Sequence, residues 1–446
     1  MEAARGNLAV LEYIGEADGK LPAARTKAAS SAFFWLSAFF VVYCARPEDW
    51  VPGLKYFPLA KITGICALWG LYKIGGLRSQ VLRRLPRESS YLLALIAVFY
   101  FSAVFSPIWP GGALSHAIDF SKCYIVWLLT FLLVTDFAKF RRVVFIQAAC
   151  VAVIALVSVV KGHSEPRLAG VLGGIYSNPN DLAFAIVLSL PFCLAFLLSA
   201  KSGLKKVAWL CAMLMMAVTL ALTASRAGFV DLMVAGTVCL WHFGVKGKRP
   251  FLIVATAVLG LLVMLAAGRT LKDRLVATAS EEDSVNGEDL GARGSFEARR
   301  YLMEQALRGI KQYPILGIGI NNFITYSGDW HEVHMSYLQI AVEGGIPALI
   351  LYLLFFSRGF SNLRTLRQVR NPNPETTLFV GALHSSLVGF VVGALFAPEG
   401  YQFFPYFTVG YTSALLAIMQ QREPVTVTDS AVPRLLRSSL ETYAPG

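Results

Sequence analysis

The segment from His331 to Phe356, HEVHMSYLQIAVEGGIPALILYLLFF, joins titratable side chains to an apolar run long enough to cross a membrane. His331, Glu332 and His334 precede the run, and Glu343 lies inside it. A neutral histidine near pH 7 can take a proton from a hydroxyl group. Ionisable groups are costly inside a bilayer, so they indicate functional or paired positions. We therefore predict a reactive site at the mouth of this helix.

Three arginines are expected on the same side of the membrane as these histidines. Arg167 opens the segment RLAGVLGGIYSNPNDLAFA, and Arg226 lies in the short hairpin TASRAG. Arg299 lies in SFEARRYLMEQALRGIKQYP, a segment of helical period with Ser295 as its expected cap. A projection at about 100° per residue puts Arg299 in the middle of the apolar face. That face is expected to comprise Phe296, Leu302, Met303, Ala306, Leu307 and Ile310.

The planar fork of a guanidinium group suits phosphate oxygens. Arginines beside a neutral histidine predict a reaction on a phosphate-bearing group held at the lipid interface. A simpler interpretation of Arg299 is that its side chain reaches along the membrane surface to a lipid phosphate.

Other chemistries fit the sequence less well. His331 and His334 could share a zinc ion, but the chain has no H-E-x-x-H and offers no convincing third ligand. No G-x-S-x-G for serine catalysis is present. We predict neither a metal nor a cofactor. Asn178 and Asn180 are predicted as supporting residues of the site, and the stretch Asn178-Pro179-Asn180-Asp181 is expected to cap the helix that follows it, with a structural role favoured for Asn180 and Asp181.

The elements that position these residues are membrane helices. The chain of 446 residues is 56% apolar and 15% charged, whereas soluble domains carry about 25% charged residues. We predict an all-α polytopic membrane protein with about twelve transmembrane helices and one long outer loop. The expected spans are 30–45, 58–76, 90–109, 117–135, 143–160, 181–200, 207–224, 227–245, 250–267, 336–356, 378–397 and 403–419.

Lysine and arginine fix the expected orientation. With the N-terminus in the cytoplasm, the basic residues fall mainly in cytoplasmic loops and only five fall in the short outer loops, as the positive-inside rule requires. The net charge of +12 is therefore attributed to topology and anionic lipid, not to nucleic-acid binding. No signal peptide is visible, and the first span is expected to be an uncleaved anchor. The predicted order is a cytoplasmic segment 1–29, transmembrane helices 1–9 over 30–267, an outer loop 268–333, transmembrane helices 10–12 over 334–419, and a cytoplasmic tail 420–446. The outer loop is expected to have a mobile acidic first part and an amphipathic helix after it.

Four segments in register resemble motifs of the O-antigen ligase and polymerase superfamily. HMSYLQIAVEGGIPALILYL resembles its His-Asn-Ser-Tyr-Leu start followed by Glu-x-Gly, and ARRYLMEQALRGIKQYPILGIGINNF resembles its Gly-Arg-x-x-x-Trp helix ending in Pro-x-x-Gly-x-Gly. RLAGVLGGIYSNPNDLA and SRAG resemble its Asn-Pro-Asn element and its Ser-Arg turn. The likeness covers about residues 165–356.

This resemblance implies a GT-C-like glycosyltransferase that moves a glycan from undecaprenyl diphosphate to an acceptor hydroxyl, on a lipid or a glycan, at the periplasmic face of the bacterial inner membrane. It implies His334 as the catalytic base and Arg226 and Arg299, with Arg167, on the diphosphate. Glu343, His331, Asn178 and Asn180 are taken as supporting residues. The implied partners are the lipid-linked glycan donor, the acceptor and membrane lipids.

The sequence departs from the family pattern at three positions: Met335 replaces Asn, Met303 replaces Trp and Ala298 replaces Gly. Met335 removes a polar neighbour of the expected base, and Glu332 or Glu343 could substitute for it. A polysaccharide polymerase of the same superfamily is the nearest alternative. A polysaccharide transporter or flippase is the alternative from another class, and it would show inverted repeats and broken helices with charges near the midplane.

Overall fold

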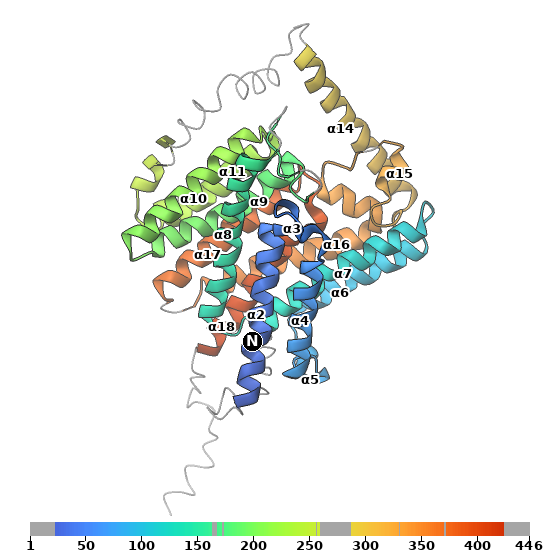
Figure 1. Cartoon of the computed structure of the whole chain (residues 1–446). Coiled ribbons are helices and arrows are strands. Elements are labelled where there is room, and N and C mark those ends of the chain that lie inside the picture. Colours follow the sequence, from blue (N-terminus) through green and yellow to red (C-terminus); the bar gives the residue numbers. More distant parts are fainter. Residues whose placement is uncertain are drawn as a thin grey trace, which may run out of the picture.

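The computed structural model describes residues 23–162, 167–171, 174–255, 257–258, 287–329, 331–369 and 372–422. Within these residues the regular structure is helical throughout (Figure 1). The elements are α2 (Ala23–Ala45), α3 (Pro47–Trp50), η2 (Leu54–Tyr56), α4 (Leu59–Lys73), α5 (Ser79–Leu82), α6 (Arg87–Val104), α7 (Pro110–Leu133), α8 (Phe137–Lys161), α9 (Pro179–Ser199), α10 (Gly203–Leu222), α11 (Arg226–Cys239), η3 (Leu240–Val245), α14 (Gly287–Gln312), α15 (Phe323–Ser327), α16 (Ser336–Leu366), α17 (Pro374–Gly393), η4 (Glu399–Tyr401) and α18 (Phe403–Arg422).

Nine helices in the described part of the chain are long and apolar enough to cross a membrane. The chain is therefore an all-helical, multi-pass membrane protein, as predicted. Large apolar side chains such as Val104, Val160 and Leu204 are more than 60% exposed on these helices, which suits contact with lipid and not with water.

The three other expected spans differ from these nine. The second, at 58–76, corresponds to α4, whose 15 residues measure about 22 Å and fall short of a hydrocarbon core of about 30 Å. The last, at 403–419, lies in α18, which has the length but is less apolar. The span 250–267 lies for the most part outside the described residues. The total of twelve stays a prediction.

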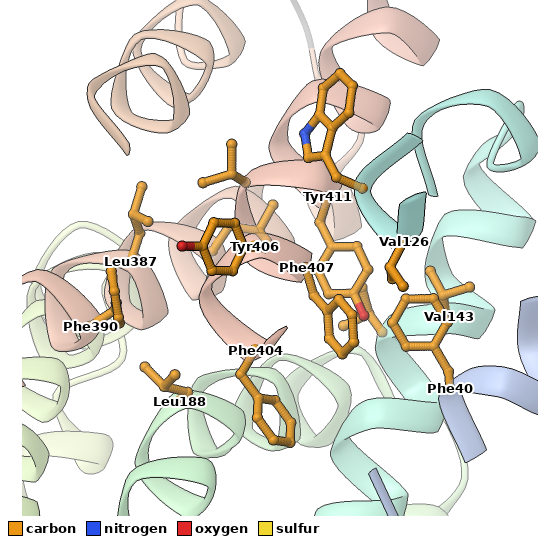
Figure 2. Close-up of a cluster of buried hydrophobic side chains, with 14 of the residues drawn as sticks. Phe40, Val126, Val143, Leu188, Leu387, Phe390, Phe404, Tyr406, Phe407 and Tyr411 are labelled. Carbon is orange, nitrogen blue, oxygen red and sulfur yellow. The ribbon is translucent and has the colours of Figure 1, made fainter. Parts of the chain in front are cut away.

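Helix α18 is less apolar because it forms the centre of the bundle. Figure 2 shows Tyr406, Phe407 and Tyr411 among side chains of the surrounding helices. Phe407 lies 4.7 Å from Phe40 of α2, measured between ring centroids, and the Tyr411 hydroxyl donates to Gln147 Oε1 of α8 at 2.9 Å. A helix enclosed by protein can carry hydroxyl groups because they find partners there.

The amphipathic helix of the outer loop is longer than predicted and lies differently. Helix α14 begins at Gly287, so Ser295 is inside it and the prediction that Ser295 caps it is wrong. Leu302 and Ala306 are buried, as expected, in a cluster with Ile318 and Val342. Met303 and Leu307, by contrast, are each more than 40% exposed. The buried stripe of α14 is thus narrower than the projected face, because only one side of that face meets protein. Phe296, also placed on that face, has a side chain outside the described part.

Helix α16 is broken near its outer end. Gly345 has a φ of 75° and is not helical. Two residues later Pro347 lacks the backbone N–H that would bond to the Glu343 carbonyl. That carbonyl accepts instead from Gly319 N at 2.9 Å and from the Ser102 hydroxyl at 2.6 Å.

The segment PILGIG, residues 314–319, supplies the remaining partners of the break. Ile346 N donates to the Pro314 carbonyl at 2.8 Å, and Ile318 N donates to the Val342 carbonyl at 2.9 Å. Gly317 has a φ of 67°, and a Cβ there would lie 2.5 Å from the Glu343 carbonyl carbon. The segment PILGIG and the Gly344-Gly345 pair of α16 therefore form one structural unit. The chain's own backbone occupies this break, whereas in a transporter a broken helix lines the substrate site.

Candidate active site

The Arg167 side chain joins the segment before α9 to the hairpin between α10 and α11. Its Nε donates to the Thr223 carbonyl at 2.8 Å, and its Nη2 donates to Asn180 Oδ1 at 3.0 Å. The same Asn180 oxygen accepts from the Ser225 hydroxyl at 2.8 Å, and Ser225 Oγ in turn accepts from Gly228 N and caps α11. Arg226 is the first residue of α11 after this cap, so the loop network fixes its position.

Helix α9 is capped by Asn178, whose side-chain oxygen accepts from Asn180 N at 2.9 Å. The prediction that residues 178–181 cap this helix is therefore confirmed at Asn178, whereas Asn180 and Asp181 follow the cap inside the helix. The side-chain oxygen of Asn180 is used for Arg167 and Ser225, because proline at the first helical position leaves the preceding residue as the cap.

Arg299 comes within electrostatic reach of His334 on one side and of Arg226 on the other. Burial first, and then the neighbouring Arg299 and His331, lower the pKa of His334 to about 4. Burial, together with the neighbouring Arg226, lowers the pKa of Arg299. His334 is thus unprotonated at neutral pH and able to accept a proton. The Arg299 guanidinium of α14 lies near it, and the Arg226 guanidinium of α11 lies near Arg299; such crowding of positive charge favours a bound anion.

One nitrogen of the Arg299 side chain is left unsatisfied by the described part of the chain. Its Nε is buried and finds no hydrogen-bond partner among the described residues. A buried N–H without a partner is costly. This atom therefore favours the prediction that Arg299 faces a site, over the simpler interpretation that it reaches a lipid phosphate.

The second histidine has different surroundings. His331 Nδ1 lies 2.8 Å from Asp329 Oδ1, and its side chain is 66% exposed. It lies near enough to His334 to affect the pKa of that residue. The part of the chain that the structure describes contains no group of three or more metal-ligating side chains that could hold a metal ion.

A set of carboxyl groups lies beside these residues. Burial and the Asp181 carboxylate raise the pKa of Glu332 to about 6. Burial and Asp181 also raise the pKa of Glu399, which is hydrogen-bonded to Asp181, well above its usual range. Glu399 is therefore a neutral acid that donates to the Asp181 carboxylate. The sequence analysis missed Glu399, although APEGYQ placed an acidic residue in an outer loop.

Glu343 is a buried anchor on α16. One carboxylate oxygen accepts from the Tyr401 hydroxyl, and the other accepts from Phe323 N at 3.4 Å. The Glu343 side chain is 1% exposed and joins the broken helix to η4 and α15. These contacts show a structural function for Glu343, as a support of the outer end of α16.

Comparison with known proteins confirms the resemblance. Residues 211–353 match the family model described as O-antigen ligase, and this range contains Arg226, Arg299, His334 and Glu343. A chain from a solved peptidoglycan synthase complex, described as coordinating polymerization and crosslinking, aligns with 75% of this chain and 97% of its own length, at 15% identity and a TM-score of 0.42. That likeness is too slight to carry an argument. No curated protein matches.

Proposed function

We propose that this O-antigen ligase-like membrane protein transfers a glycan from undecaprenyl diphosphate to an acceptor hydroxyl on the periplasmic face of the bacterial inner membrane. The family implies an enzyme of the ligase or polymerase kind. The observation that carries the finer proposal is the unprotonated His334 beside the paired charges of Arg299 and Arg226.

In the proposed reaction His334 accepts the proton of the acceptor hydroxyl. The acceptor oxygen attacks the anomeric carbon on the face opposite the diphosphate, and the bond from that carbon to the diphosphate oxygen breaks. Arg299 and Arg226 bind the diphosphate as negative charge develops on it, which is the step where fixed positive groups lower the barrier most. Arg167 supports the site by holding the hairpin that carries Arg226.

The test is transfer by purified full-length protein supplied with a labelled lipid-linked oligosaccharide. His334→Ala should abolish transfer, whereas His331→Ala, at a supporting residue whose side chain is exposed and paired with Asp329, should reduce it far less. Loss of one donor to the developing charge typically costs about 2.7–4 kcal/mol, so Arg299→Ala should slow transfer by at least about 100-fold. A fully active His334→Ala protein would refute the assignment of the base.

A polymerase of the same superfamily uses the same chemistry with a growing glycan as acceptor. The size of the labelled product decides between the two: a ladder indicates a polymerase, and a single conjugate indicates a ligase.

A further inference from the structure

Several buried polar atoms near the outer end of the bundle have no hydrogen-bond partner among the described residues. They are Arg299 Nε, both amide atoms of Gln339, Glu399 Oε1 and Asp231 Oδ1. Gln339 and Asp231 are each 1% exposed, and Glu399 is 2% exposed. Each such atom costs free energy unless something outside the protein satisfies it. Four elements, α14, α16, η4 and α11, contribute these atoms.

The position of Gln339 on α16 shows the direction of its side chain. Leu338 and Val342 lie on the face that packs against α14. Ser336, which donates to the Ala397 carbonyl, and Glu343 lie on the face that meets η4 and its loop. At about 100° per residue, Gln339 falls between these two faces. Its amide therefore points between the helix that carries Arg299 and the turn that carries Glu399.

The carboxyl groups share this region. Glu399 is hydrogen-bonded to Asp181 and lies within electrostatic reach of Glu332 and Asp231. Because the proton of Glu399 is donated to Asp181, the free Oε1 of Glu399 is an acceptor. Asp231 Oδ1 is also an acceptor, and the Gln339 amide can both donate and accept. The matching ligand offers several hydroxyl groups at once, which is the chemistry of a sugar.

We infer that Gln339, Glu399 and Asp231 form a sugar subsite that binds hydroxyl groups of the glycan next to the diphosphate-binding arginines. This inference rests on the proposed function. The diphosphate is held from α11 and α14, and the sugar is held from α16, α11 and η4. The sugar belongs to the donor or to the acceptor, and the hydrogen-bonding chemistry is the same for both.

The experiment measures binding to purified full-length protein by native mass spectrometry, with three probes. They are undecaprenyl diphosphate, which has no sugar, the lipid-linked oligosaccharide pool of the host, and the free oligosaccharide released from that pool. The variants are Gln339→Leu and Glu399→Leu. Gln420→Leu is the matched control, because Gln420 Oε1 also lacks a partner among the described residues but lies at the other end of the bundle, on α18.

We expect both variants to bind undecaprenyl diphosphate like the wild type and to lose at least about 10-fold of the preference for the glycan-bearing lipid, while Gln420→Leu keeps it. If that preference stays but free oligosaccharide no longer binds to protein saturated with undecaprenyl diphosphate, the subsite holds the acceptor sugar. Unchanged sugar binding in both folded variants would overturn the subsite alone. A wild-type protein that binds neither lipid would overturn the proposed function, and the subsite with it.

Folding is checked by the melting temperature. Replacing the unpartnered buried amide of Gln339 with leucine should leave the melting temperature of the ligand-free protein unchanged or raise it, whereas Glu399→Leu also removes the donor to Asp181 and should lower it. A variant that folds and melts like the wild type but has lost the sugar preference therefore reports on binding.

Discussion

The pKa of His334 should rise when the charge of Arg299 is removed. In the wild type this pKa lies at about 4 in place of 6.5, a decrease of about 2.5, and burial is its largest cause, with Arg299 second. The share of Arg299 is therefore less than half of the decrease. Arg299→Gln keeps a side chain of similar length without the charge, so we expect the pKa of His334 to rise to about 5, which corresponds to about 1.4 kcal/mol.

Deuterium exchange at the imidazole C2 position, followed by mass spectrometry over a pH series, measures this pKa without any need for activity. The residual kcat/KM of the variant gives a second measurement, because kcat/KM reports the free enzyme. A base must be unprotonated, so activity is lost as pH falls through the pKa. The wild type should lose activity near pH 4, and Arg299→Gln should lose its residual activity about one pH unit higher.

The control is Arg300→Gln. Arg300 is the next residue of α14, but its side chain is 74% exposed and pairs with Glu304 at 3.1 Å. Its removal should leave the His334 pKa where it is. An unchanged or lower His334 pKa in Arg299→Gln, or an equal rise in Arg300→Gln, would refute the interpretation that Arg299 faces the imidazole.

Three further predictions concern stability, measured as melting temperature in detergent. Gly345→Ala should destabilise the protein by at least ~1–3 kcal/mol, because alanine is strained at this positive φ and its Cβ would lie 2.2 Å from a backbone oxygen. The control is Gly236→Ala, whose Cβ meets nothing within 4 Å and which should stabilise the helix by up to ~1 kcal/mol. Equal effects of the two substitutions would contradict this view of the break. Tyr401→Phe removes a donor to buried Glu343 and should cost ~1–3 kcal/mol; an unchanged melting temperature would mean that this contact is unimportant. The pKa of Glu332 is raised from 4.5 to about 6, so its burial lowers the stability of the folded protein progressively as pH rises from 4.5 through 6. Glu332→Gln should therefore stabilise the protein by up to ~2 kcal/mol at pH 8 but hardly at pH 4. A stabilisation that does not depend on pH would exclude this cause.

The sequence predicted the helices well because a lipid-facing helix must be apolar along its length. It placed the nine helices that carry this pattern. It predicted α18 as a span from the length of its apolar run. The Tyr and Thr residues within that run are explained only by the structure, where protein surrounds them. The same limit explains α14: projection identified an apolar face, but which half of that face meets protein depends on the neighbouring elements.

The sequence allowed a prediction of those site residues whose side chains are chemically distinctive, such as histidine and arginine. The sequence analysis named His334, Arg226 and Arg299, and the structure places Arg299 within electrostatic reach of both His334 and Arg226. Whether they act as base and diphosphate ligands stays a prediction. Gln339 and Glu399 could not be singled out, because a glutamine in an apolar run is not notable until both of its amide atoms are seen to be buried without partners.

The break in α16 lies inside its candidate membrane span. Beyond Gly345, the apolar run continues for the eleven residues from Ile346 to Phe356, about 16 Å of helix, which is roughly half of the hydrocarbon core. The nine residues from Ser336 to Gly344 are therefore needed to complete the crossing. Backbone bonds from residues 314–319 join the two pieces, so a change in that loop should disturb membrane insertion as well as the position of His334, two residues before α16.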